Sequence, residues 1–160
     1  IACDTSALQY LHQLGALEIL PALSERVVVP PAVVAELETG RSKGMDLPDP
    51  AAIAWMNVEA PAGASVVVLA TDLGAGEGQV LALGLDRPNL VVVIDDRLAR
   101  RLARQLGIKH TGTLGLLLDA KTKGVIPEVR PMLDRLEELG FRIHPRTRSA
   151  VLDLAGESRT

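Results

Sequence analysis

Aromatic residues, cysteine and long apolar runs are all scarce in this sequence. Among 160 residues only Tyr10, Trp55 and Phe141 are aromatic, which argues against proteins that bind single strands by stacking bases on aromatic platforms. The single cysteine, Cys3, excludes an internal disulfide and fits a reducing compartment. The longest apolar run, residues 51–56, is too short for a membrane helix, and no signal-peptide pattern is visible. We therefore expect a cytoplasmic protein with no membrane association.

Positive charge is also limited. The chain has 17 Lys and Arg against 20 Asp and Glu, and the net charge of −3 argues against a protein that coats nucleic acid by bulk charge. Its 3 histidines are scattered and form no recognisable zinc motif with the single cysteine. No P-loop motif occurs. Residues 74–79 begin like a dinucleotide-binding turn, but Gln79 stands where the third glycine should be.

The rest of the composition is that of a folded globular chain. Hydrophobic residues make up 48% of the sequence and charged residues 23%, which excludes a disordered chain. A length of 160 residues fits one hydrophobic core, because two cores would leave both halves small. We therefore predict a single domain over residues 1–160.

Short apolar segments alternate with amphipathic ones along the chain. The buried strands that we predict are Ile1–Cys3, Arg26–Val29, Leu90–Ile94 and Ile108–Thr111. Weaker strand patterns occur at Val66–Leu69 and Phe141–Ile143, and Ala51–Val58 is ambiguous between helix and strand. Helices are expected over residues 4–14, 16–23, 32–39, 77–84, 97–106, 113–123, 127–139 and 147–155. This alternation predicts an α/β fold in which helices cover both faces of a parallel sheet.

Acidic residues follow several of these strands. Asp4 ends the first strand, Glu36 lies in the helix after the second, and Glu77 opens the helix after a glycine-rich turn. Asp95 and Asp96 end the most apolar strand. Ligands of open α/β sheets bind beyond the carboxyl ends of the strands, so these acids are predicted to share one rim.

Each of these acids also has a structural explanation when it is taken alone. Asp4 and Asp95 could serve as helix N-caps, and Glu77 could interact with a helix dipole. Glu36 could be a solvent-facing residue of an amphipathic helix. Their shared placement at the same end of successive units favours a functional cluster. Clustered carboxylates repel one another, and all-oxygen ligands favour hard cations such as Mg²⁺ or Mn²⁺, which typically serve phosphoryl transfer or phosphodiester hydrolysis.

Four arginines follow the acidic pair at helical spacing. They are Arg97, Arg100, Arg101 and Arg104. Such a charge run is often only the solvated face of a helix. Because this helix begins beside the predicted rim, the run is also interpreted as a patch that steers phosphate groups toward the site.

Several motifs together resemble the PIN domain, a metal-dependent nuclease fold, and more narrowly a prokaryotic PIN-like family described as predicted nucleic-acid-binding proteins. The segments that carry the resemblance are Asp4-Thr5-Ser6, Pro31–Leu37 with Glu36, Leu73–Glu77, Ile94–Arg97, Arg101–Ala103, Thr111–Gly115, Ala120-Lys121 and Gly124–Ile126. The resemblance covers nearly the whole chain. It implies a three-layer α/β/α sandwich with a central parallel sheet.

The resemblance also implies a function. It predicts a Mg²⁺- or Mn²⁺-dependent endoribonuclease that cuts single-stranded RNA, commonly the toxin of a type II toxin–antitoxin pair, which dimerises and is blocked by a small antitoxin. The residues that match the catalytic and metal-binding acids are Asp4, Glu36, Glu77 and Asp95, with Asp96 contributing or replacing Asp95, and Ser6 matches a hydroxyl near the metal.

Two other functions are compatible with parts of this pattern. A catalytically weak or inactive PIN-like module could bind RNA or a protein partner without cutting. A phosphotransfer receiver is another small α/β fold with an acidic pocket, but its paired acids should follow the first strand, whereas here the pair is Asp95-Asp96.

Overall fold

The central feature of the computed structural model, which describes residues 1–63 and 72–158, is a sheet of five strands. The strands are β1 (Ala2–Cys3), β2 (Val27–Val29), β3 (Met56–Val58), β4 (Val92–Val93) and β5 (His110–Thr111). Their order is β3-β2-β1-β4-β5 and all pairings are parallel, with Ala2 aligned to both Val28 and Val92. The chain therefore builds outward from β1 in one direction and then returns to build in the other.

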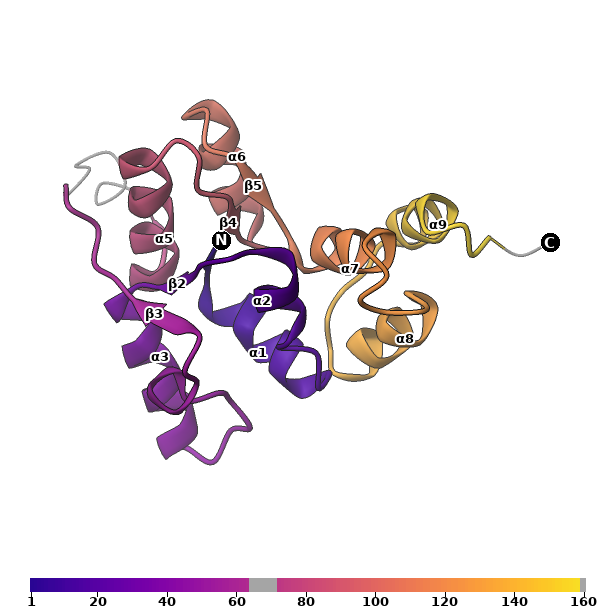
Figure 1. Ribbon diagram of the computed structural model, residues 1–160, viewed down its shortest axis with the longest axis horizontal. Coiled ribbons are helices and arrows are strands. Elements are labelled where there is room, and N and C mark those ends of the chain that lie inside the picture. The colour runs from indigo at the N-terminus through magenta and orange to yellow at the C-terminus, as the bar shows by residue number, and fades with distance from the viewer. Residues whose placement is uncertain (64–71, 159–160) are drawn as a thin grey trace.

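Helices cover both sides of this sheet. Those of the sheet region are α1 (Thr5–Gln13), α2 (Ile19–Leu23), α3 (Pro31–Ser42), α5 (Ala75–Asp86) and α6 (Arg97–Gln105), with a short 3-10 helix η1 (Pro50–Ala52) before β3. Figure 1 shows α5 and α6 on one face and α1 and α2 on the other, and α3 packs against both α1 and α5. The predicted α/β/α sandwich with a central parallel sheet is confirmed.

The C-terminal part of the chain forms a helical lobe beside the sheet. It consists of α7 (Thr113–Thr122), α8 (Arg130–Glu138) and α9 (Pro145–Leu154). Figure 1 shows α7 next to the sheet region, with α8 and α9 farther out. In the described part of the chain, no helix is both long and apolar enough to cross a bilayer.

The core forms because the strands β1, β2 and β4 consist only of small and branched apolar residues. Every residue of β1, β2 and β4 is buried, as expected for central strands with helices on both faces. Leucines of α1, α5 and α7 fill the space above and below the sheet. A rigid core of this kind fixes the strand ends, which carry the acidic residues.

Two strand predictions are settled by the structure. The ambiguous segment 51–58 divides into the end of η1 and strand β3. The edge strand predicted at Phe141–Ile143 is wrong, because the N–H of Phe141 donates to the carbonyl of Leu136 at 2.9 Å and so completes the end of α8. Gly140, with φ of 94°, makes that helix end possible. The strand pattern at Val66–Leu69 lies outside the described residues.

Several helix starts also differ from the predictions by one to three residues. Helix α8 begins at Arg130 instead of Pro127, because the Glu157 carboxylate accepts hydrogen bonds from the N–H groups of Val129 and Arg130. The hydroxyl of Thr113 makes this residue a candidate N-cap of α7, but it is the first residue of that helix. The cap is supplied from a distance by Asp95, as described below.

Candidate active site

The predicted acidic rim lies where the winding of the sheet reverses direction. Strand β1 is central, the chain builds first toward β2 and β3, and it later places β4 on the other side of β1. Asp4 directly follows β1, and Ile94 and Asp95 directly follow the two residues of β4. Such a switch point leaves a crevice beyond the carboxyl ends of the two strands, so it is the place where α/β sheets bind ligands.

A cavity of about 200 Å³ opens at this rim. Its lining comes from the first turn of α1, from α3 and from the start of α5, and consists of Asp4, Thr5, Ser6, Gln9, Glu36, Gly74 and Glu77. Three of the four predicted catalytic acids and the predicted hydroxyl therefore line one cavity. Asp95 and Asp96 lie beside it without lining it.

Asp4 is the most deeply buried of these acids, with 1% of its surface exposed. It is the N-cap of α1, because its Oδ1 accepts a hydrogen bond of 2.9 Å from the N–H of Ala7. Burial and, to a smaller extent, the nearby carboxylates of Asp95 and Glu77 raise the pKa of Asp4 to about 7, although the hydrogen bond from Ala7 opposes the shift. The capping and functional interpretations of this residue are thus compatible.

Glu36 is held by two other elements and does not face open solvent. Its carboxylate accepts a hydrogen bond from the Thr5 hydroxyl at the start of α1 and one of 2.9 Å from the N–H of Gly76 in α5. A methyl group on Gly76 would lie 2.5 Å from Glu36 Oε2, so this approach requires a residue without a side chain. We call this arrangement of Thr5, Glu36 and Gly76 the Glu36 clamp.

Glu77 lies in the first turn of α5 and directly follows Gly76 of the Glu36 clamp. Its Oε2 accepts a hydrogen bond of 3.2 Å from the N–H of Gly74. Partial burial raises the pKa of Glu77, and the negative charges of Asp96 and Glu36 add to the effect. The side chain therefore belongs electrostatically to the same cluster.

The two acids after β4 point in different directions. Asp96 is exposed and caps its own helix α6, accepting a hydrogen bond of 2.8 Å from the N–H of Ala99. Asp95 reaches across to α7, where it accepts bonds from the N–H of Thr113 at 2.8 Å and from its hydroxyl at 2.6 Å. The cap of α6 is thus Asp96, and the expectation that Asp95 could serve as that cap is wrong.

The predicted arginine patch divides into two kinds of residue. Arg97, Arg101 and Arg104 are exposed on α6. Arg100 is partly buried, and its guanidinium donates a bond of 3.4 Å to the carbonyl of Ile94 at the end of β4. Three of the four arginines are therefore free to meet a ligand in solvent, while Arg100 supports the strand end that carries Asp95.

None of the rim acids is neutralised within the described residues. Residues 1–63 and 72–158 contain eight ion pairs, and these involve none of Asp4, Glu36, Glu77, Asp95 and Asp96. Buried carboxylates without a cationic partner are costly. Bound cations would provide the missing positive charge, and the all-oxygen donor set fits a hard divalent ion.

The acids are near one another but are not arranged as a finished ligand shell. In the described ranges no three Asp, Glu, His or Cys side chains are grouped closely enough to hold a metal ion. Instead, each rim acid accepts a hydrogen bond from a nearby N–H or hydroxyl group. Binding an ion would require some of these side chains to turn toward it.

Comparison with known proteins gives one match. A protein-family model described as DUF3368, PIN domain, matches residues 1–157. The chain belongs to the PIN-domain family. No curated protein and no solved structure matches it significantly. PIN domains are generally nucleases and typically use divalent metals, so the family indicates a nuclease-type function for the acidic rim.

Five residues at or beside the rim of this PIN domain were not among the predicted site residues. Thr5 and Gly76 hold Glu36, Gln9 and Gly74 line the cavity, and Thr113 binds Asp95. The sequence places Thr5 beside Asp4 and Gly76 beside Glu77, and that adjacency was the only available signal. Thr113 lies 18 positions from Asp95, so no local pattern could have paired them.

Proposed function

We propose that the chain is a metal-dependent endoribonuclease that hydrolyses phosphodiester bonds of single-stranded RNA. The observation that supports this most strongly is the group of uncompensated carboxylates around a cavity, at the switch point of a PIN-domain sheet. The scarcity of aromatic residues indicates that RNA is held mainly through its phosphates, with little base stacking.

Each rim residue has a role in this proposal. Asp4, Glu36, Glu77 and Asp95 would hold Mg²⁺ or Mn²⁺, and Asp96 would add negative charge beside them. When bound, such an ion supplies Lewis-acid stabilisation of the phosphate and makes water a stronger nucleophile at neutral pH. The Ser6 hydroxyl lines the cavity and can donate a hydrogen bond to a substrate oxygen.

The substrate must approach this acidic rim in spite of its own negative charge. The exposed arginines of α6, Arg97, Arg101 and Arg104, would attract phosphates to it, and Arg100 would hold the end of β4 in place. This division of work gives the arginine patch both a steering role and a positioning role.

We further propose that the protein is the toxin of a type II toxin–antitoxin pair, acts in the cytoplasm as a homodimer, and is inhibited by a small antitoxin. The resemblance noted from the sequence motifs supports this proposal. A short adjacent reading frame for a DNA-binding antitoxin, and co-purification of its product with this chain, are the observations that would test it.

A cleavage assay tests the nuclease proposal. Labelled single-stranded RNA is incubated with Mn²⁺ and the wild type, Asp4→Asn, or Asp119→Asn, which changes an exposed carboxylate outside the rim. We expect cleavage by the wild type and Asp119→Asn, and a loss on the order of 100-fold or more in Asp4→Asn, because even losing an outer partner of a metal ligand costs about 10- to 100-fold. Equal, EDTA-resistant cleavage by all three proteins would refute the assignment.

A second candidate function is an RNA- or protein-binding module that does not cut. The observation in its favour is that the acids of the described ranges form no ready group of three around an ion. Calorimetric titration with Mn²⁺ separates the two functions. Micromolar to millimolar affinity that disappears in Asp4→Asn supports the nuclease, whereas negligible heat together with RNA binding by both proteins supports the module.

A further inference from the structure

A second basic surface lies at the turn between α8 and α9, outside the site described above. It consists of Arg142, His144 and Arg146, all of them exposed, and we call it the basic corner. The surrounding stretch 141–152 contains no acidic residue. The corner is thus a second local excess of positive charge, besides α6, in a chain whose net charge is −3.

The acids of α8 that precede the corner are already paired with other arginines. On α8, Asp134 and Glu137 both pair with Arg148, and Glu138 pairs with Arg135. Within residues 1–63 and 72–158, Arg142 and Arg146 take part in no ion pair. The corner therefore keeps its positive charge available for an external anion.

Packing connects the corner to helix α1, whose first turn lines the acidic cavity. The ring of Phe141 meets that of Tyr10 edge to face, with 4.9 Å between their centres. Tyr10 follows Gln9, which lines the acidic cavity. The N–H of Phe141 is bonded to Leu136, and His144 caps α9 by accepting from the N–H of Arg146 at 3.2 Å. The corner is thus held firmly against the helix whose first turn forms the rim.

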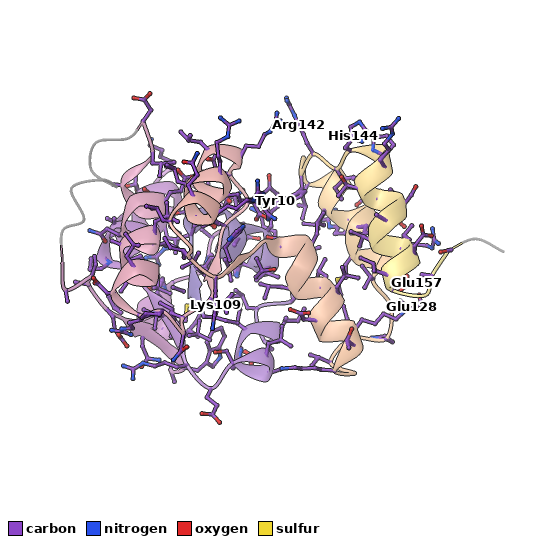
Figure 2. All side chains as sticks on the ribbon, turned by 90° about the horizontal axis from the view of Figure 1, so that it is seen from above. Tyr10, Lys109, Glu128, Arg142, His144 and Glu157 are labelled. Carbon is purple, nitrogen blue, oxygen red and sulfur yellow. The ribbon has the colours of Figure 1, made fainter. Side chains whose placement is uncertain are left out.

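The corner also faces the same end of the molecule as the rim. Lys109 immediately precedes β5, so in Figure 2 it marks the amino ends of the parallel strands. Arg142 and His144 lie at the opposite end in that view, which is the end where the strands finish and the rim acids begin. Helix α6, with its exposed arginines, also starts at that end.

We propose that the basic corner is a distal phosphate-binding subsite for single-stranded RNA whose backbone crosses the acidic cavity. The inference rests on the nuclease proposal and extends it. An acidic rim repels the phosphates that it has to receive wherever its charge is not offset by a bound ion, so cationic side chains on either side of it add to the affinity for RNA. The arginines of α6 provide one side, and Arg142 and Arg146 provide the other. Only RNA long enough to reach past the cavity contacts the corner.

A binding assay with short and long RNA tests this subsite. Fluorescence anisotropy would be measured in the Asp4→Asn background, which prevents cleavage, with labelled oligonucleotides of increasing length. The test variant is Arg142→Ala/Arg146→Ala. The matched control is Lys109→Ala/Lys123→Ala, which removes two exposed positive charges near the amino ends of the strands. Arg142→Lys/Arg146→Lys keeps the charge and should retain binding, and thermal melting verifies the fold of each variant.

The expected result is a loss that depends on RNA length. The test variant should bind the longest RNA about tenfold more weakly, and the slope of log affinity against log salt should fall by about 1.4, since each neutralised phosphate of a single strand contributes about 0.7. The shortest RNA and the control variant should show no change. Unchanged affinity and slope for the test variant, in a protein whose wild type cleaves RNA, would overturn the corner alone. A parent protein that binds no RNA would overturn the corner and the proposed substrate together.

Discussion

Carboxylates at two places in this molecule have opposite environments. At the rim, Asp4 and Glu77 have raised pKa values, neighbouring acids and no ion pair in the described residues. In the C-terminal lobe, Glu157 accepts from Lys121 Nζ at 2.5 Å and from two backbone N–H groups, at 2.6 and 2.8 Å. These contacts lower the pKa of Glu157 to about 2 although partial burial opposes the shift.

We interpret this difference as one between a structural carboxylate and the carboxylates of the proposed site. Glu157 joins α7, the start of α8 and the segment after α9, and every charge in that contact is matched within the chain. The rim acids are held in place by amides and hydroxyls that orient them without cancelling their charge. Unmatched charge lowers stability, and in the proposed function it is what attracts a cation to the rim, so that stability is given up for function.

The largest effect that we predict is a gain of stability when the rim loses a charge. In metal-free buffer at pH 8, Asp4→Asn should be more stable than the wild type by a few kcal/mol, because asparagine keeps the N-cap and needs no ionisation in a buried place. The folded pKa of about 7 lies above the ordinary value of 3.8, so wild-type stability falls as the pH rises through this window. The two proteins should therefore have similar stability below pH 3.8.

Chemical denaturation in EDTA, followed by circular dichroism at several pH values, measures this gain. Saturating Mn²⁺ should reverse it by stabilising the wild type alone, by about 2.7 kcal/mol at one hundred times the dissociation constant. An Asp4→Asn protein that is less stable than the wild type at pH 8 in EDTA would show that the buried carboxylate is a stabilising group.

Removing the charge of Glu157 should lower the stability of the protein, whereas removing that of Asp4 should raise it. Glu157→Gln should lose about 2 kcal/mol of stability at pH 7, because Lys121 and the first turn of α8 lose a charge-assisted acceptor. The folded pKa of about 2 lies below the ordinary 4.5, so this contribution is complete above pH 4.5 and is lost as the pH falls toward 2. The proposed ribonuclease activity, measured well below the melting temperature, should not change.

Acid titration of both proteins, followed by circular dichroism, checks the Glu157 prediction. The difference in stability between wild type and Glu157→Gln should shrink across the window from pH 4.5 to 2. A constant difference over that range would mean that packing of the side chain, and not its charge, holds the lobe together.

The smallest effect concerns the Glu36 clamp and should appear in metal binding more than in stability. In Gly76→Ala the new methyl group would displace the Glu36 carboxylate, the mobile end of a side chain, so unfolding should change by less than about 1 kcal/mol. Affinity for Mn²⁺ should fall about tenfold, or 1.4 kcal/mol. Gly74→Ala is the matched control, because its methyl group would lie 3.6 Å from Glu77 Oε2 and the φ of Gly74 is −61°.

Calorimetric titration of Gly76→Ala and Gly74→Ala with Mn²⁺ tests whether the position of the Glu36 carboxylate affects metal affinity. Thr5→Val should resemble Gly76→Ala because it removes the other bond to Glu36, while Thr5→Ser should retain affinity. Equal Mn²⁺ affinity in Gly76→Ala and Gly74→Ala would show that the position of Glu36 does not matter for the metal.

Local sequence patterns were sufficient to predict the central strands and the helices that follow them. Valine-rich segments such as Val27–Val29 can be buried only as central strands, and a polar residue such as Asp4 after a strand begins the next helix. Because parallel strands end at one edge, these patterns also predicted that Asp4, Glu36 and Glu77 would meet. The Phe141–Ile143 prediction was wrong because apolar alternation does not reveal where a backbone N–H will bond.

Tertiary structure alone decided how Glu36, Asp95 and Glu157 are held. The partners of Glu36 lie 31 and 40 positions away, that of Asp95 lies 18 away, and Lys121 is 36 from Glu157. Contacts at such separations depend on the packing of whole helices, which no local periodicity encodes. The sequence by itself determined which carboxylates gather near the ends of the strands, whereas the folded chain decided that those of the rim have no ion-pair partner within residues 1–63 and 72–158 and that Glu157 is neutralised.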